Sequence, residues 1–190
     1  MSRERMFDIF THMPQITTER LLLRKIVIQD AEDMFSYAKL SEVTRYLTWY
    51  EHPDLLYTKR YITFLQRKYH AGEFYDFAVV HRADRKMIGT CGFARLDATN
   101  STGEVGYVFN PVYWQQGLAT EAVQAMIRFG FETLGLHRIE ARFMIHNLAS
   151  RRVMEKCGMT FEGIHRGLMQ IKGKAEDIGI CACINPAHII

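Results

Sequence analysis

A helix between two strand-like segments is the feature of this sequence that most constrains its fold. Residues 117–134 predict an amphipathic helix, and Gly135 follows where a helix would end. The apolar residues of this helix recur along one stripe: Leu118, Ala122, Met126 and Phe129. The segments 102–109 and 138–145, one on each side, predict strands. A helix that links two strands in this way implies a right-handed crossover between parallel strands, so we expect an α/β protein.

Further strands and helices surround this unit. The additional strands are expected at 21–26, 74–81, 87–94, 160–167 and 174–184, and the additional helices at 30–40, 55–70 and 148–157. The second and third of these strands predict an antiparallel hairpin, because only a short polar segment separates them. Asp30 and Asn147 precede helices and are expected to cap them. Together these elements predict an α/β (α+β) fold with a mixed central sheet of six to seven strands and helices on both faces.

Composition indicates one ordinary globular domain. The 190 residues are 48% hydrophobic and 24% charged, which is close to the usage of soluble proteins. No linker rich in Pro, Gly or Ser divides the chain. We therefore expect a single domain over residues 1–190, with an N-terminal arm at residues 1–14.

Several classes of partner are disfavoured by the same composition. No apolar run approaches the length of a membrane span or of a signal peptide, so we expect a cytoplasmic protein with no membrane partner. The net charge of +3 is scattered and not gathered in basic runs, which argues against nucleic acid. The four cysteines form no Cys-x-x-Cys pair, so we expect free thiols and no metal site.

The turn before the central helix has features of a phosphate-binding site. Residues 113–120 follow the break at Pro111, and Gly117 allows the backbone to approach a ligand closely. The first N–H groups of a helix have no partner inside it and lie at the positive end of its dipole. Such a turn can hold a pyrophosphate, although one glycine before a helix is more often only a turn.

Several ordered motifs are similar to those of a known enzyme family. They are Glu104–Pro111 (EVGYVFNP), Tyr113–Ala122 (YWQQGLATEA), Asn147–Met159 (NLASRRVMEKCGM) and Phe161–Gly163, with Thr18–Arg24 and Ile88–Gly92 before them. Together they resemble the GNAT acetyltransferase superfamily over residues 16–184, and more narrowly its RimJ/RimL-type branch, which acetylates protein N-terminal amines. The resemblance implies the GNAT fold and an N-acetyltransferase that uses acetyl-CoA as co-substrate, without a metal.

The resemblance also implies which residues hold acetyl-CoA. The strand position that pairs with pantetheine and the thioester carbonyl matches the backbone of Val108, Phe109 and Asn110. The pyrophosphate loop matches Trp114, Gln115, Gln116, Gly117, Leu118, Ala119 and Thr120. Gln116 stands where a basic residue is common, which removes one phosphate-binding cation. Asn147 matches an asparagine that bonds the pantetheine arm, and a cap can coexist with that contact.

Two residues are candidates for proton transfer. Glu104 matches the strand position at which several members of the superfamily carry their base, acting directly or through water; alternatively, it is a solvated residue at a strand start. Ser150 matches a serine proposed as the acid in this branch; alternatively, it is an ordinary first-turn serine. Gly179 and Cys181 replace tyrosines that often supply the acid, so we expect that route to be absent.

The acceptor is the least constrained part of the prediction. Deprotonating a lysine with a pKa of ~10.4 at pH 7 costs about 4.6 kcal/mol, whereas an α-amino group with a pKa near ~8 needs a much weaker base. We therefore expect a protein N-terminal α-amine, such as that of a ribosomal protein. The alternatives are a small amine such as a polyamine or antibiotic, or a non-catalytic acyl-CoA-binding regulator. The aromatic stretch 46–61 either lines an acceptor groove or packs helices, and a homodimer through a strand edge stays open.

Overall fold

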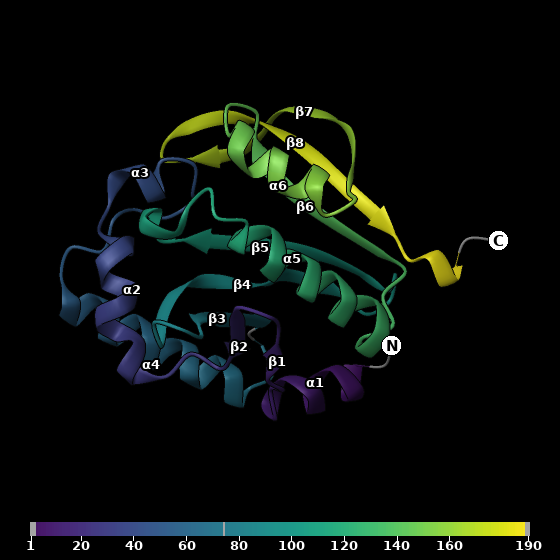
Figure 1. Cartoon of the computed structure of the whole chain (residues 1–190). Helices are drawn as coiled ribbons and strands as arrows, with labels where there is room; N and C mark the ends of the chain where they lie inside the picture. The colour runs from purple at the N-terminus through teal and green to yellow at the C-terminus, as the bar shows by residue number, and fades with distance from the viewer. Residues whose placement is uncertain (1–2, 74, 189–190) are drawn as a thin grey trace.

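The computed structural model describes residues 3–73 and 75–188, which form one eight-stranded mixed sheet flanked by helices (Figure 1). The strand order is β1-β2-β3-β4-β5-β6-β8-β7. The bounds are β1 Ile16–Thr17, β2 Leu21–Arg24, β3 Tyr75–His81, β4 Lys86–Asp97, β5 Thr102–Phe109, β6 Arg138–Met144, β7 Thr160–Ile171 and β8 Lys174–Ile184. Neighbouring strands run antiparallel except β5 and β6, which run parallel.

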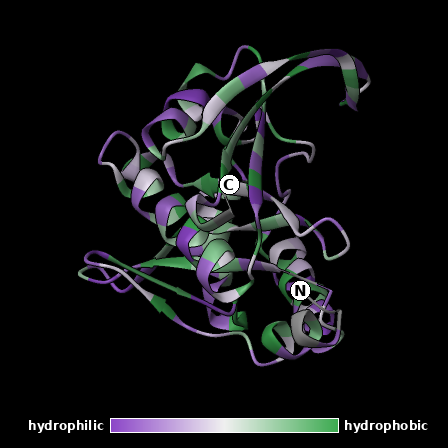
Figure 2. Ribbon diagram, turned by 90° about the vertical axis from the view of Figure 1, so that its right-hand side faces the viewer, coloured by the Kyte–Doolittle hydropathy of each residue, from purple (hydrophilic) through white to green (hydrophobic). Residues whose placement is uncertain are grey.

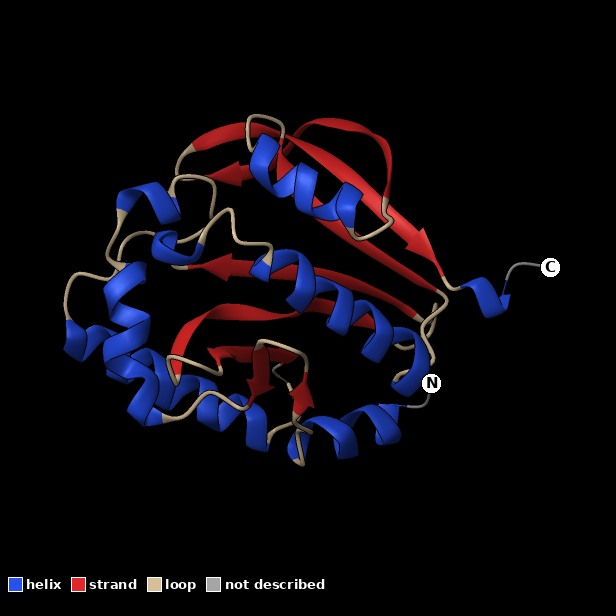
Figure 3. Ribbon diagram, viewed as in Figure 1, coloured by secondary structure: helices blue, strands red, loops and turns tan. Residues whose placement is uncertain are grey.

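Helices cover both faces of this sheet (Figure 3). They are α1 Arg3–Thr11, α2 Ala31–Ala38, α3 Ser41–Thr44, α4 Leu55–His70, α5 Leu118–Arg128 and α6 Leu148–Lys156. We call the face that packs against α1, α5 and α6 the first face, and the face that packs against α2 and α4 the second face. Within the described ranges, no helix is long and apolar enough to cross a membrane.

The two faces have separate hydrophobic cores, because successive side chains of a strand point to opposite sides. On β5, Val105, Tyr107 and Phe109 pack into the core of the first face, which also holds much of α5. Val108 packs instead against the core of the second face, with residues of α2 and α4. In Figure 2 the hydrophobic colour gathers on strands in the middle of the molecule and on parts of the helices.

The central unit of the fold forms as predicted. β5 has the predicted bounds, and β6 pairs with it in parallel after α5. Helix α4 also has its predicted bounds, because Asp54 accepts a hydrogen bond from the Tyr57 N–H at 2.6 Å and Gly72 takes a left-handed conformation after the last turn. Helix α5 is shorter than expected and continues as a π-helical stretch over Phe129–Thr133.

Three details differ from the sequence expectations. The N-terminal arm contains α1, which the sequence pattern did not predict, and its Phe10 is fully buried against Tyr75. Asp30 lies before α2 but does not cap it, because its carboxylate pairs with Arg24 and accepts the Val27 N–H. The described sheet has eight strands and not six or seven, since the two-residue β1 pairs with β2.

Candidate active site

The parallel strands β5 and β6 pair only where they begin. Their register joins Thr102–Glu104 to Arg138–Glu140 and, in the described strands, goes no further. Beyond these residues β5 stays paired with β4, and β6 stays paired with β8 through Met144. Figure 3 shows the two strands moving apart toward their carboxyl ends. We call this unpaired stretch, Val105–Phe109 facing Ala141–Met144, the β5–β6 gap.

Backbone groups of β5 point into this gap. The N–H of Asn110 donates to Ile88 on β4 at 2.8 Å, which sets the alternation along the strand. By that alternation the peptide groups of Val108 also face β4, whereas those of Tyr107 and Phe109 face the gap. Of the three backbone positions expected to meet the cofactor, the geometry therefore leaves Phe109 available and adds Tyr107. The N–H groups of Val108 and Asn110 are committed to β4.

The amino end of α5 presents free donors close after β5. Gly117 takes a left-handed conformation with φ 78° and lets the chain turn sharply into the helix. Glu121 is the first helical residue whose N–H bonds back into the chain, to Gly117 O at 3.0 Å. Among the described residues, the N–H groups of Leu118, Ala119 and Thr120 have no acceptor, as expected of a first turn. This end of the helix is therefore suited to an anion.

The loop that leads into α5 is held by its own side chains. The indole Nε1–H of Trp114 donates to the Phe109 carbonyl at 2.8 Å, which fixes the loop against the end of β5. Gln116 Nε2 donates to the Val112 carbonyl at 2.9 Å. Gln115 has a φ of 61°, a left-handed conformation that is uncommon for a residue with a side chain. The loop is therefore shaped before any ligand arrives.

Arg20 supplies the cation that the loop itself lacks. Its guanidinium donates to the Gln116 carbonyl at 2.9 Å and pairs with Glu121 at 2.7 Å, so it lies beside the first turn of α5. A side chain added at Gly117 would lie 3.5 Å from Arg20 Nη2. The sequence pattern did not identify this residue, because Arg20 is separated from the loop by about a hundred positions and lies just before β2.

Helix α6 begins at the end of β6 and brings two candidate residues to the gap. Asn147 caps the helix, since its Oδ1 accepts the Ser150 N–H at 3.1 Å. The Ser150 hydroxyl lies 2.8 Å from the Tyr107 hydroxyl, which also donates to the Ser150 carbonyl at 2.9 Å. Burial raises the pKa of Tyr107 well above its usual value, so this phenol is a neutral proton donor near pH 7. Tyr107 was not predicted as a site residue, although its place between the apolar Val105 and Phe109 of the same strand indicated that it would face the same side of the sheet.

The positions that lack tyrosines are filled by other side chains. Gly179 on β8 lies opposite Phe143 on β6, and a Cβ at Gly179 would lie 2.4 Å from the Phe143 ring. Phe143 therefore occupies the space that a larger residue at 179 would need. Cys181 is fully buried in the core of the first face, and burial raises the pKa of its thiol.

Glu104 lies on the other face of the sheet, at the closed end of the gap. Its carboxylate lies 3.3 Å from Arg142 Nε, in a cavity of about 220 Å³ that Glu140 and Arg95 also line. Burial raises the pKa of Glu104, while the charge of Arg142 opposes that rise. A carboxylate with a raised pKa and a water-accessible position is suited to accept a proton.

The aromatic stretch 46–61 reaches the open end of the gap, since Tyr46 packs against the small cluster that contains Met144 of β6. The aromatic stretch 46–61 gathers around His52, whose ring contacts Trp49, Tyr57 and Tyr61 and whose Nδ1 lies 2.8 Å from the Thr58 hydroxyl. Part of this stretch faces solvent, since Tyr50 is 64% exposed. In the residues that the structure describes, no group of three His, Cys, Asp or Glu side chains could hold a metal ion.

Comparisons with known proteins agree with this geometry. The family model described as Acetyltransferase (GNAT) domain matches residues 20–160. The uncharacterized N-acetyltransferase p20 of Bacillus licheniformis is 32% identical over 166 residues, which cover 87% of this chain and 93% of that protein. The ribosomal protein uS5-alanine N-acetyltransferase of Escherichia coli K12 is 24% identical over 192 residues, covering 95% and 97% of the two chains.

A solved structure of a GNAT-family acetyltransferase has a similar fold. The GNAT-family acetyltransferase from Bacillus anthracis has a TM-score of 0.80 at 31% identity and covers 90% of this chain and 99% of its own. Because the family model spans most of the chain and these relatives align over nearly their full lengths, the chain belongs to the GNAT family, is an acetyltransferase, and has relatives among the ribosomal-protein acetyltransferases of the RimJ/RimL type.

Proposed function

We propose that this enzyme transfers the acetyl group of acetyl-CoA to a protein N-terminal α-amine, with the thioester held in the β5–β6 gap. The observation that carries the proposal is the early end of pairing between β5 and β6, which leaves the peptide groups of Tyr107 and Phe109 without a strand partner. A pantetheine arm is rich in amide groups and can pair with such an edge. The gap lies between the carboxyl ends of two parallel strands, where α/β proteins commonly bind ligands.

Acetyl-CoA approaches from the first face in this proposal. The amino ends of α5 and α6 both follow the open end of the gap, one after β5 and one after β6. The free N–H groups of Leu118, Ala119 and Thr120, together with Arg20, suit a pyrophosphate. The Asn147 side-chain N–H₂ is available for a pantetheine carbonyl, because its capping contact uses only Oδ1.

The chemistry of the transfer follows from the same groups. Attack of a neutral amine on the thioester carbonyl produces an oxyanion, and a backbone N–H of Tyr107 or Phe109 is aimed into the gap to stabilise it. One such donor contributes roughly 3 to 4 kcal/mol in other acyl-transfer enzymes. The departing thiolate takes a proton from Ser150, the Tyr107 hydroxyl at 2.8 Å gives its proton to the serine oxygen, and water then returns a proton to Tyr107.

Glu104 receives the proton of the amine through water in this scheme. Tyr107 lies three positions after Glu104, and a strand rises about 3.3 Å per residue, so the two lie about 10 Å apart along β5. That distance is too long for direct contact with an amine at the thioester, but a chain of about three waters that begins in the Glu104 cavity can bridge it. An α-amine suits this indirect base, because an amine with a pKa near ~8 loses its proton at pH 7 at a small free-energy cost.

The proposed acceptor is tested by release of free thiol from acetyl-CoA. Peptides that begin with Ala, Ser or Met are compared with blocked peptides that carry only lysine amines, and with small amines. We expect release with free α-amines and at most one-tenth of that rate with lysine. Faster release with lysine or small amines would contradict the α-amine proposal, and no release with any acceptor would contradict transfer itself.

The Tyr107–Ser150 relay predicts a non-additive pair of mutations. Tyr107→Phe and Ser150→Ala should each lower kcat by roughly 10- to 100-fold, because each interrupts the same proton path. The double variant should be no slower than the slower single variant. The affinity for CoA, measured by calorimetry, should change less than about threefold. Multiplicative losses in kcat, or normal kcat in either single variant, would rule out a shared relay.

The Glu104 assignment predicts a change in pH dependence. Because burial raises the pKa of this carboxyl, the wild-type kcat/KM should rise with pH through a value above the ordinary 4.5 as Glu104 loses its proton. Glu104→Gln should lack this limb and lower kcat/KM by roughly 100-fold at pH 7. Glu140→Gln, which removes the neighbouring carboxylate that also pairs with Arg142, is the matched control and should keep the limb. An unchanged profile in Glu104→Gln would exclude Glu104 as the base.

A further inference from the structure

A second carboxylate, Asp76 on β3, is buried without a cation. Its Oδ1 is inaccessible to water and, among the described residues, has no hydrogen-bond partner. Burial raises the pKa of Asp76 to about 7, and the hydroxyl of Thr90 and the N–H of Phe77 only partly oppose that rise. Burying a carboxylate without a cationic partner is costly, and such a group is normally paired or neutral. Among the described residues, no cation pairs with Asp76 to offset the free energy of burying its carboxylate.

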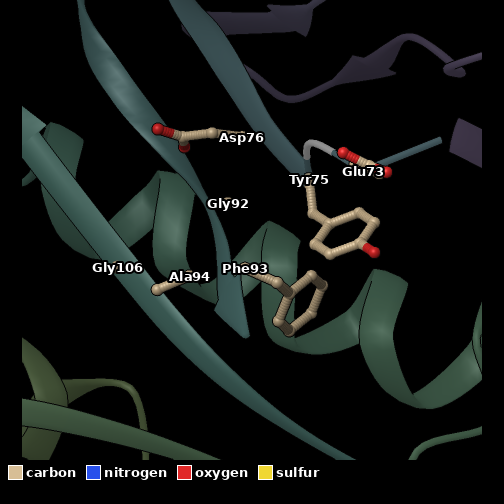
Figure 4. A pocket seen from close by; sticks show the side chains of 7 residues that line it. All are labelled: Glu73, Tyr75, Asp76, Gly92, Phe93, Ala94 and Gly106. Atoms are coloured by element: carbon tan, nitrogen blue, oxygen red, sulfur yellow. The ribbon is translucent and has the colours of Figure 1, made fainter. Parts of the chain in front are cut away.

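Asp76 lies at one end of a row that crosses the second face of the sheet. The register places Asp76 beside Gly92 on β4, and Gly92 beside Gly106 on β5. A Cβ at Gly92 would lie 2.7 Å from Asp76 Oδ1, so the carboxylate leans over β4 toward β5. These residues line a cavity of about 150 Å³. Figure 4 shows Asp76 and Ala94 projecting to one side of the sheet, with Tyr75 and Phe93 on the other.

The two glycines of this row have different explanations. Gly92 is required by packing, because a side chain there would meet the Asp76 Cα and the Tyr75 carbonyl oxygen at 2.3 Å. Packing does not require a glycine at position 106, because a Cβ at Gly106 would meet only the Ala94 Cβ, at 3.8 Å. A glycine inside a central strand weakens the strand, and often marks a place where a ligand approaches the backbone. The open space above Gly106 joins Asp76 to the edge of the β5–β6 gap.

The groups around Asp76 leave its charge uncompensated. The phenol groups of Tyr37, Tyr61 and Tyr69 converge from α2 and α4, and the charge of Asp76 contributes to keeping all three neutral. Glu73 lines the same cavity but is exposed and pairs with Lys68. The other titratable groups on the packed elements are Tyr75 on β3, Cys91 on β4, Glu104 on β5 and Asp33 on α2, which accepts the Met87 N–H. The cations on these elements are engaged elsewhere: Arg24 pairs with Asp30, Arg95 lines the Glu104 cavity, and Lys25 lies over the Tyr69 ring.

The distance from Asp76 to the gap limits what it can bind. Oδ1 lies over β4, so one and a half to two strand spacings, roughly 7 to 10 Å, separate it from the gap. A cation bonded to Oδ1 on the side of Gly106 would lie about 3 Å nearer, or roughly 4 to 7 Å from a reacting nitrogen in the gap. The reacting amine itself cannot occupy both places. A second positive group on the same acceptor can bind Asp76 while the reacting amine lies in the gap.

We propose that Asp76 and the open space over Gly106 form a subsite for a second cationic group of the acceptor, roughly 4 to 7 Å from the amine that is acetylated. This inference rests on the proposed acetyl transfer in the β5–β6 gap and names the class of its substrate. A lysine or arginine side chain next to a protein N-terminus has this separation, and so does a short alkyl diamine. Asp76 is a specificity residue in this account and does not touch the reacting atoms.

The test measures binding of paired acceptors to the full chain saturated with CoA. The pairs are peptides that begin Ala-Lys or Ala-norleucine, and 1,5-diaminopentane or pentylamine. In calorimetry we expect the cationic member of at least one pair to bind at least about tenfold more tightly. The pair that shows the preference identifies the source of the cation. Equal affinities within both pairs would overturn the inference, whether or not acetylation occurs.

Three variants separate the subsite from a general loss of structure. Asp76→Asn should bind the two members of each pair equally and should keep its CoA affinity and thermal midpoint. Gly106→Ala places a methyl group in the space without a clash and should weaken binding of the cationic member of a pair more than binding of the neutral member. Glu73→Gln removes the exposed carboxylate of the same cavity and should change nothing. A preference that survives in Asp76→Asn would overturn the inference.

The preference should also depend on pH with a defined sign. The carboxyl binds a cation only when it is deprotonated, so the ratio of affinities within a pair should rise as pH increases through about 7. Deprotonation of the shared α-amine affects both members of the peptide pair and cancels in the ratio. Free thiol release with Ala-norleucine reports separately on the proposed function, since this peptide lacks the second cation. A ratio that stays constant between pH 6 and 8 would contradict a role for Asp76.

Discussion

The end of pairing between β5 and β6 is the feature on which the candidate site depends. Parallel strands in the middle of a sheet normally satisfy each other's peptide groups along their length. Here each strand is held firmly by its outer neighbour, β4 or β8, and the two lose contact after Glu104. The Phe109 carbonyl accepts from the Trp114 indole, whereas the N–H groups of Tyr107 and Phe109 and the Tyr107 carbonyl then need other partners. A ligand that carries amide and carbonyl groups meets that need.

The two faces of the sheet present groups of opposite charge around this gap. The first face offers positive helix ends, Arg20 and the Tyr107–Ser150 hydroxyls, which suit an anionic cofactor and a departing thiolate. The second face offers carboxylates, with Glu104 beside the closed end of the gap and Asp76 further across the sheet. In the proposed scheme, the negatively charged cofactor binds from the first face and the acceptor, with its second cation, binds from the second face.

Local sequence patterns predicted the elements whose signals are self-contained. The crossover around α5, the ends of α4 and the cap at Asn147 follow from periodicity and capping residues within a few positions. Asp30 misled the prediction, because its carboxylate satisfies Arg24 on a neighbouring element. Arg20 and Asp76 were not predicted for the same reason. Their roles come from contacts with residues distant in sequence, on α5 and on β4, which no local pattern reports.

Exchange of individual backbone amides, followed by NMR with and without acetyl-CoA, tests the central claim most directly. The account predicts that saturating acetyl-CoA slows exchange at Tyr107 and Phe109, whose N–H groups face the gap. Exchange at Val108 and Asn110 should stay as it is, because the Asn110 N–H is bonded to Ile88 and that of Val108 faces β4 in the same way. Tight binding of acetyl-CoA with no added protection at Tyr107 and Phe109 would contradict the placement of the thioester between β5 and β6.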